Sequence, residues 1–164
     1  MAGRITASDS QLRPDPQYGD LVLSRFINCV MYDGKKAVAQ RVVYEAMESI
    51  QKKLEKETDP AAPKTALEVF QRAIENVKPM VEVRSKRVGG ANYQVPIPVN
   101  RKRQQSLAFR WIIQATRGAK GRPMGAKLAD ELFMAARNEG AAIQTKDQTH
   151  RMAEANKAFA HYAR

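Results

Sequence analysis

The chain has 164 residues, 43% of them apolar, and a formal net charge of +11. This length suits one compact domain with a single buried core, and no uncharged apolar run approaches the ~18 residues of a membrane span. Neither a secretory signal nor an acid-poor transit segment is found at the start, so we exclude a membrane partner and expect a soluble, cytoplasmic protein.

The chain begins with a segment that we expect to be extended. Residues 1–19 contain two prolines and little apolar periodicity, which predicts an N-terminal arm ahead of a single domain over residues 20–164. Asp20 can cap a first helix that ends near the turn at residues 32–34. The only cysteine, Cys29, has apolar neighbours in this helix, so we expect a buried structural thiol. The apolar side of the helix is Leu21, Leu23, Phe26, Ile27 and Val30.

A second helix is expected from Lys35 until the prolines at positions 60 and 63. Lys35 and Lys36 place two cations and free backbone amides at its start, which predicts a contact with one backbone phosphate. Gly34 and Lys35 form a Gly-Lys pair, but the upstream glycine and the following Ser or Thr of a nucleotide-binding loop are absent. The apolar residues recur every four positions, at Val38, Val42, Ala46, Ile50 and Leu54.

A capping box predicts the start of a third helix. Thr65 and Glu68 have the spacing at which a hydroxyl and a carboxylate satisfy the free amides of the first turn. Pro79 is expected to end this helix. Its apolar side is Leu67, Phe70, Ile74 and Val77.

The apolar period then changes to two, which predicts a β-hairpin over about residues 80–99. Aligning the apolar faces pairs Val83 with Ile97 and Val81 with Val99, and leaves residues 89–91 as a three-residue loop. Pro96 and Pro98 alternate along the second strand, so their missing N–H groups face the same edge and only two strands can pair. A free-standing ribbon of this kind is marginal in water, so we expect an arm that reaches a partner.

Three more helices are expected after the hairpin. Asn100 can cap the fourth, which ends at residues 118–123 and carries Trp111 in its apolar stripe, as a core residue. The fifth follows from Met124 and is closed by Gly140. A second capping box at Thr145 is expected to open the last helix, which runs through residue 162. The fold class is therefore mainly α: a single-domain bundle of about six helices with a protruding two-stranded β-hairpin between helices three and four.

The positive charge is concentrated in one segment. Residues 83–129 contain eleven Lys or Arg and no Asp or Glu, whereas the rest of the chain carries seventeen of each. An acid-free block of this length is typical of a surface that meets a polyanion. Three consecutive cations at positions 101–103 oppose the dipole of the fourth helix, which favours external phosphates at that point.

Catalysis has little support in the sequence. His150 and His161 are eleven residues apart, about 16 Å along one helix, so they cannot share a metal. They suit RNA contact or an ordinary solvated surface equally well. Gly118 and Gly121 resemble the loop of KH domains, but the strands of that fold are missing. We therefore expect no enzyme, no cofactor, no metal and no catalytic residue.

Several long strings of residues resemble bacterial-type small-subunit ribosomal protein seven. They are the strings at residues 26–36, 75–79, 81–84, 87–91, 93–96, 103–108, 110–111 and 149–162, which together span almost the whole chain. The resemblance implies a primary binder of small-subunit ribosomal RNA that nucleates assembly of the head. It also implies a position at the subunit interface by the exit site, near transfer RNA and messenger RNA, with ribosomal proteins nine and eleven as neighbours and no homo-oligomer.

The basic residues and this resemblance together give two sets of expected contacts. For ribosomal RNA we expect Arg4, Lys35, Lys36, Lys78, Arg101, Arg103, Arg110, Arg117, Lys120 and Arg122. For transfer RNA and messenger RNA at the exit site we expect Arg84, Lys86, Arg87, Gly89, Gly90, His150 and Arg151.

Two other functions fit parts of the sequence. A proline-bearing β-arm on a helical body also occurs in architectural DNA-binding proteins, but such a wedge needs an apolar tip, and residues 86–90 are Lys-Arg-Val-Gly-Gly. An RNA-modifying enzyme would need convergent acids and bases, and the basic block has no acid at all.

Overall fold

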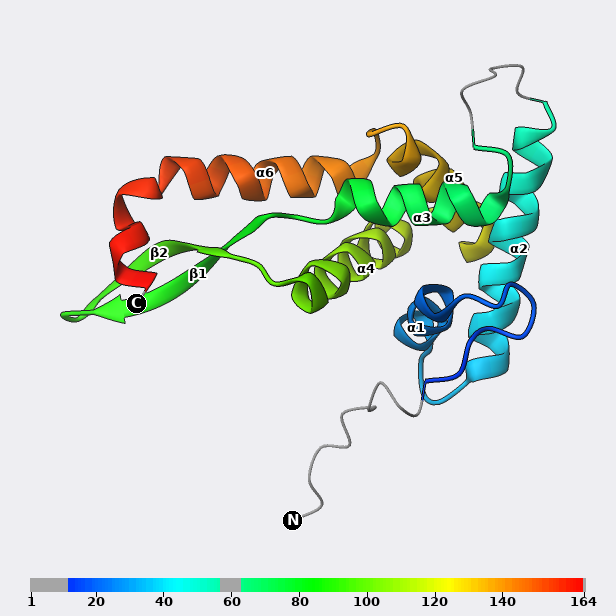
Figure 1. Cartoon of the computed structure of the whole chain (residues 1–164), viewed down its shortest axis with the longest axis horizontal. Coiled ribbons are helices and arrows are strands. Elements are labelled where there is room, and N and C mark those ends of the chain that lie inside the picture. The colour runs from blue at the N-terminus through cyan, green and yellow to red at the C-terminus, as the bar shows by residue number, and fades with distance from the viewer. Residues whose placement is uncertain (1–11, 57–62, 164) are drawn as a thin grey trace, which may run out of the picture.

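The computed structural model describes residues 12–56 and 63–163, so Arg4 and Pro60, in the predicted break after the second helix, lie outside the described residues. The mainly helical fold with a hairpin between α3 and α4 is confirmed (Figure 1). The elements are α1 (Leu21–Val30), α2 (Lys36–Leu54), α3 (Ala66–Val77), β1 (Val81–Val88), β2 (Ala91–Pro98), α4 (Arg101–Gly118), α5 (Met124–Ala136), α6 (Ala141–Ala155) and the 3-10 helix η2 (Lys157–Ala163).

The molecule has two parts, which we call the body and the arm. The body comprises α1 to α5 and the first turn of α6, and the arm comprises the hairpin, the rest of α6 and η2. In Figure 1, α6 and the hairpin extend together away from α2, and η2 folds back over the hairpin. The hairpin is therefore not free-standing as expected, because α6 packs along β1 and η2 along β2.

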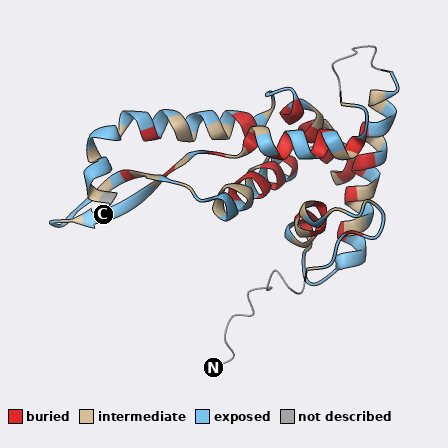
Figure 2. Ribbon diagram, in the orientation of Figure 1, coloured by how far each residue is buried: buried red, intermediate tan, exposed pale blue. Residues whose placement is uncertain are grey.

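The core fills the body and stops where the arm begins (Figure 2). Phe26 is fully buried and makes edge contacts with Phe70 and Phe109, with ring centroids 5.4 and 5.3 Å away. These three rings join α1, α3 and α4. Val95 is fully buried in the hairpin, but it does not belong to this core cluster.

Three helix starts have the predicted caps. The side chain of Asp20 accepts from the Leu23 amide at 2.6 Å, and that of Asn100 accepts from the Arg103 amide at 2.9 Å. The hydroxyl of Thr65 accepts from the Glu68 amide, and the Glu68 carboxylate accepts from the amide of Lys64. Each bond satisfies an amide that the helix itself leaves unpaired.

The apolar side of α2 differs in phase from the prediction. Its buried residues are Ala39, Val43, Ala46, Met47 and Ile50, whereas Val38 is exposed. A strict step of four drifts around a helix that has 3.6 residues per turn, so it leaves the buried face over three turns. A similar correction applies to α1, where Leu21 is half exposed and the other predicted residues are buried.

The junction of α5 and α6 was predicted wrongly. α5 ends at Ala136, with Asn138 in the left-handed region at φ 61°, so Gly140 does not close it. Gly140 instead precedes α6, which begins at Ala141, and Thr145 lies inside that helix. The cap comes from another helix: the buried Glu131 carboxylate accepts from the Ala142 amide at 2.8 Å. A cap contributed by tertiary contact leaves no local sequence signal.

The last helix is also shorter than predicted. α6 ends at Ala155, and the chain continues as η2, so His150 and His161 lie on different elements. On α6, Met152 is half exposed, whereas the neighbouring Ala153 is buried.

The hairpin register differs from the prediction because the turn sets it. Val88 pairs with Ala91, so the loop is Gly89-Gly90, with φ values of 57° and 88°. Two central residues with positive φ form the type I′ turn, whose twist matches that of the strands. The register then pairs Val83 with Pro96 and Val81 with Pro98. The Val99 amide donates to the Met80 carbonyl, so the alternating prolines face the outer edge, as predicted.

The start of the described chain is tied to α2. Residues 12–19 contain a turn in which the Asp15 carboxylate accepts from the amides of Gln17 and Tyr18, both at 3.1 Å. The Tyr44 hydroxyl donates to the same carboxylate at 2.8 Å. Desolvation, and to a smaller extent this bond, raise the pKa of Tyr44 to about 12.

Candidate nucleic-acid interface

The described residues contain no cluster of His, Cys, Asp or Glu that could hold a metal ion. Over the same part of the chain, no helix has the length and apolar character needed to cross a membrane.

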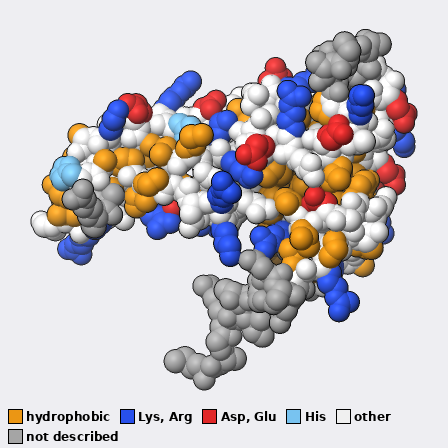
Figure 3. Space-filling model, in the orientation of Figure 1, with side chains coloured by type: hydrophobic (Ala, Val, Ile, Leu, Met, Phe, Trp, Pro, Cys, Tyr) orange, Lys and Arg blue, Asp and Glu red, His pale blue; other side chains and the backbone are white. Residues whose placement is uncertain are grey.

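The basic block lies on the hairpin, on α4 and in the loop between α4 and α5. In Figure 3, Lys and Arg side chains dominate the lower edge of the view, from the hairpin tip to the region of α4. The two acids that flank the block in sequence, Glu82 and Asp130, both turn back to pair with it. These pairs divide the predicted cations into two groups.

Glu82 orders the base of the hairpin. It is only 7% exposed, and its carboxylate accepts from Nε of Arg84 at 2.6 Å and from Nε of Arg103 at 3.1 Å. The partner of Arg103 at the start of α4 is thus a carboxylate of the chain itself, where we had expected an external phosphate. This ion-pair cluster fixes the strand against α4.

Other predicted cations also have internal partners. Arg122 pairs with Asp130 at 2.7 Å, and Lys78 pairs with Glu75 at 2.5 Å. Arg117 donates to the Val30 carbonyl at 3.2 Å and lies over the ring of Tyr32. The carboxylates of Asp130 and Glu75 partly neutralise the charge of Arg122 and Lys78.

The remaining predicted cations point outward. Each is exposed and forms no ion pair within residues 12–56 and 63–163: Lys35, Lys36, Arg87, Arg101, Arg110, Lys120 and Arg151. They lie at the start of α2, at two exposed positions of α4, in the loop after α4, on α6 and near the hairpin tip. Exposed cations of this kind are the groups that contact phosphates.

The hairpin tip is held by η2. Tyr93 packs on Phe159 and Tyr162, with ring centroids 5.2 and 5.3 Å away, and Lys86 donates to the Tyr162 carbonyl at 2.7 Å. Tyr93 therefore packs against η2. Beyond this cluster only Arg87, Val88, the two turn glycines, Ala91 and Asn92 extend outward.

The two histidines serve separate local contacts. Nε2 of His150 accepts from the Met80 amide at 3.2 Å, which joins α6 to the base of the hairpin. His161 packs on Tyr162 with ring centroids 4.0 Å apart. Their positions on the arm place them near Arg151 and the exposed hairpin residues, respectively.

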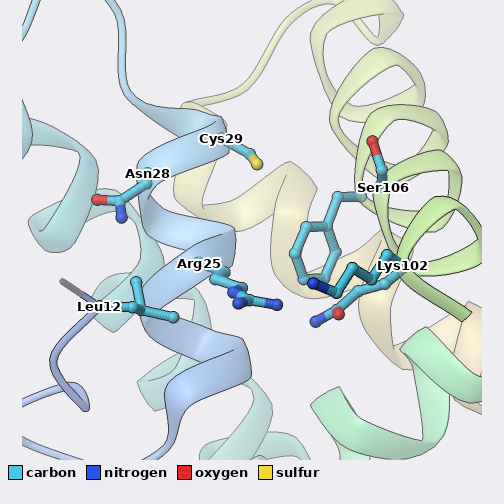
Figure 4. A pocket seen from close by; sticks show the side chains of 8 residues that line it. Leu12, Arg25, Asn28, Cys29, Lys102 and Ser106 are labelled. Atoms are coloured by element: carbon cyan, nitrogen blue, oxygen red, sulfur yellow. The ribbon is translucent and has the colours of Figure 1, made fainter. Parts of the chain in front are cut away.

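A pocket between α1 and α4 was missed by the sequence reasoning (Figure 4). It has a volume of about 280 Å³ and is lined by Leu12, Arg25, Asn28, Cys29, Lys102, Gln105, Ser106 and Phe109. Cys29 is exposed here, contrary to the prediction, because it lies on the side of α1 that faces the pocket instead of the core. Desolvation nevertheless raises the pKa of its thiol, with Arg25 opposing that shift.

Comparison with known proteins gives one consistent result. The profile of the family described as ribosomal protein S7p/S5e matches residues 2–157. Small ribosomal subunit protein uS7 of Rhodopirellula baltica is 60% identical over 161 residues, covering 98% of this chain and 99% of that protein. The proteins of the same name from Thermotoga neapolitana and Acidiphilium cryptum are 55% and 49% identical, with coverage of 97% and 99% of both chains.

Proposed function

This chain belongs to the ribosomal protein S7p/S5e family, and on that basis we propose that it binds small-subunit ribosomal RNA directly and nucleates assembly of the head. As a family member it is a structural protein of the small subunit of the cytoplasmic ribosome of bacterial type, not an enzyme. The family assignment excludes the two alternatives, an architectural DNA-binding protein and an RNA-modifying enzyme.

The observation that carries the proposal is the set of outward cations in the acid-free block of residues 83–129. Arg101, Arg110 and Lys120 lie on α4 and the loop after it, and the acids nearest in sequence are engaged with other arginines. Phosphate contacts from such residues fix a protein on folded RNA, while shape supplies specificity. Lys35, Lys36 and the remaining predicted ribosomal RNA contacts would extend the same surface.

The test is the salt dependence of RNA binding. Changing Arg101, Arg110 and Lys120 together to Gln should reduce the slope of log affinity against log salt concentration by about two to three in magnitude. The reason is that RNA binding by the variant releases about two to three fewer counterions. The matched control changes Lys52, Lys56 and Arg72 to Gln, which removes the same charge from exposed positions outside the basic block. Equal slopes for the two triple variants would contradict the proposal.

We assign the exit-site contacts to the arm. Arg87 and the turn glycines extend beyond the aromatic cluster, and Arg151 lies exposed on α6, so the arm offers transfer RNA and messenger RNA a surface separate from α4. Lys86 and Arg84 would support these contacts from positions that are already bonded within the chain. Two separate surfaces imply two separable roles.

Shortening the hairpin tests that division. Replacing residues 87–92 by Asn-Gly keeps the pairing of Lys86 with Tyr93 and provides a good type I′ turn. Reconstituted subunits should assemble their heads, and exit-site transfer RNA should bind more weakly by on the order of 1–3 kcal/mol, the size of a lost charge-assisted contact. Failure of head assembly by a variant that still folds would assign the tip to the RNA anchor instead.

The proposed protein neighbours are small-subunit ribosomal proteins nine and eleven, and we propose that the isolated chain is a monomer. Sedimentation of the free protein should give the mass of one chain. Crosslinking of reconstituted subunits should link it to proteins nine and eleven, and absence of both links would remove them as neighbours.

A further inference from the structure

We propose that Tyr32, in the turn between α1 and α2, stacks on an unpaired base of the bound RNA. This contact rests on the proposed function and deepens it, since it names a chemical group of the RNA that this part of the surface receives. It adds recognition of a base to an interface otherwise argued from phosphate contacts.

The exposure of Tyr32 sets it apart from the other aromatic side chains. Every Phe, Tyr and Trp of the chain lies within the described residues, and all of them except Tyr32 are buried or partly buried. Tyr32 is 69% exposed, so most of its ring is free to contact a ligand. Single apolar side chains are common on protein surfaces, so the surroundings of the ring must identify that ligand.

The ring is ordered before any ligand binds. The guanidinium carbon of Arg117, at the end of α4, lies 5.4 Å from the ring centroid, and the same guanidinium donates to the Val30 carbonyl at 3.2 Å. The Lys35 amide donates to the Tyr32 carbonyl at 2.9 Å, and the two residues between them have positive φ, so the turn is tight. Arg117 covers one face of the ring, which leaves the opposite face for a base. A ring that is already held loses little conformational freedom on binding.

Outward cations flank the ring from two elements. Lys35 and Lys36 follow Tyr32 by three and four positions, and Lys120 follows Arg117 by three. These three lysines are exposed and form no ion pair within residues 12–56 and 63–163. The contact of Arg117 with Tyr32 brings the end of α4 beside the turn, so both groups of lysines lie near the ring in the chain. An exposed aromatic ring among cations is typical of proteins that bind unpaired nucleotides.

A base fits this position better than a phosphate or a protein side chain does. Asp33 follows Tyr32 directly and is exposed, so its negative charge disfavours a phosphate on the ring itself. Protein interfaces are depleted in lysine, whereas an RNA backbone requires cations. The neutral base would therefore lie on Tyr32 while its neighbouring phosphates contact Lys35 and Lys36.

Two substitutions of Tyr32 test the stacking. Tyr32→Leu removes the aromatic face but keeps an apolar side chain, and Tyr32→Phe keeps the face but removes the hydroxyl. Affinity for small-subunit ribosomal RNA should fall about tenfold for the Leu variant, a typical loss for one stacked base, and should be nearly unchanged for the Phe variant. The slope of log affinity against log salt concentration should be the same in both variants and the wild type, because no phosphate contact is lost.

Two controls accompany this measurement. Urea unfolding of the free proteins should show almost equal stabilities, because Tyr32 is mostly exposed. Met134→Ala changes another exposed apolar side chain, on α5 outside the basic block, and should leave the RNA affinity unchanged.

Ultraviolet crosslinking locates the contact directly. In the complex of the wild-type protein with small-subunit ribosomal RNA, mass spectrometry of the crosslinked peptide should find the nucleotide on Tyr32. The Tyr32→Leu variant should lose this crosslink while it keeps the crosslinks made elsewhere on the chain.

The outcomes separate this inference from the proposed function. If the wild-type protein binds the RNA tightly and the Leu variant binds equally well, the stacking is wrong and the proposed function stands. Equal losses for the Leu and Phe variants would assign the contact to the hydroxyl, and a loss of affinity with a changed salt slope would assign it to a phosphate; either result overturns the stacking. If the wild-type protein fails to bind ribosomal RNA at all, both proposals fall together.

Discussion

The body and the arm are held together by different forces. In the body, fully buried aromatic and aliphatic side chains from α1 to α5 form one continuous cluster. The arm is held by three kinds of contact: the ion pairs of Glu82, the hydrogen bond from the Met80 amide to His150, and the packing of Tyr93 on η2. Burial of apolar surface is strong and insensitive to salt, whereas partly exposed ion pairs are weak and screened.

This difference is consistent with the proposed function, in which a folded protein fits an RNA partner. A body with its own core can form before RNA is present. An arm with polar and aromatic joints can adjust its position by small amounts, because opening it exposes little apolar surface. The comparison predicts that mutations in the body act on global stability, while mutations in the arm act on local opening.

The largest expected effect is in the core of the body. Phe26→Ala should lower the free energy of unfolding by about 3–5 kcal/mol, because it leaves a cavity among rings from three helices. Tyr93→Ala removes a ring of similar size from the arm and should cost much less, since Tyr93 remains partly exposed. Urea unfolding of both variants measures the difference. Equal losses would show that the arm and the body share one core.

A smaller effect is expected from the joint of the arm. Glu82→Gln keeps the size of the side chain but removes the charge shared by Arg84 and Arg103. Because the two arginine side chains are 58% and 37% exposed, water takes over part of their solvation, and we expect a loss of about 1–2 kcal/mol instead of the value for a fully buried pair.

Hydrogen exchange locates that loss. In the Glu82→Gln variant, hairpin amides such as Val99, which donates to Met80, should exchange faster, while amides in α3 and α5 keep their protection. Uniform acceleration across the chain would mean that the arm and body open as one unit, and the comparison would fail.

The body has a polar joint of its own at Tyr44. Tyr44→Phe removes a bond to the Asp15 carboxylate and should cost about 1–2 kcal/mol at neutral pH. Since the pKa of Tyr44 is raised to about 12, this stability is fully present below the unfolded value near 10 and is lost as the pH rises through 12.

Tyrosine absorbance measures this directly. Of the five tyrosines, one should titrate near pH 12 in the folded wild type, and that step should be missing from Tyr44→Phe. The stability difference between the two proteins should shrink between pH 10 and 12. A difference that stays constant over this range would rule out the bond as its cause.

The features that could be predicted from sequence are those set by neighbours in the chain. The caps at Asp20, Thr65 and Asn100 bond an amide three residues on, so residue type and spacing suffice. The hairpin was recognised from its period of two. Its register was wrong because apolar matching was preferred over the Gly89-Gly90 turn, whose backbone geometry fixes the pairing.

The features that were missed depend on contacts between distant residues. Glu131 caps α6 from α5, and Glu82 takes Arg103 away from the set of free cations, yet neither contact has a local signature. The side of α1 that bears Cys29 faces a pocket only because α4 packs beside it. Charge count therefore predicted an RNA surface, but it did not predict which cations remain available to it.

The smallest expected effect is at the surface of the body, where Asp130 joins α2 and α5. Its carboxylate pairs with Lys53 and with Arg122, and its side chain is 25% exposed. Desolvation by itself raises the pKa of Asp130, but the bonds and charges of Lys53 and Arg122 outweigh it, so the pKa is lowered. Like Glu82, Asp130 pairs with two cations. However, α2 and α5 are also joined by the apolar core of the body, so they depend less on this ion pair.

Asp130→Asn should therefore cost at most about 1 kcal/mol at neutral pH, the range for partly exposed pairs, and should leave the hydrogen exchange of α2 and α5 almost unchanged. Because the pKa of Asp130 is lower in the folded state, its ion pairs stabilise the fold at any pH above the unfolded-state pKa near 4. This stabilisation is lost as the pH falls through the pKa of the folded state. Thermal unfolding of wild type and variant should thus converge below pH 4. Glu139→Gln, a change at an exposed carboxylate, is the control and should show no difference at any pH. A loss for Asp130→Asn as large as that for Glu82→Gln would mean that the body relies on its ion pairs as much as the arm does.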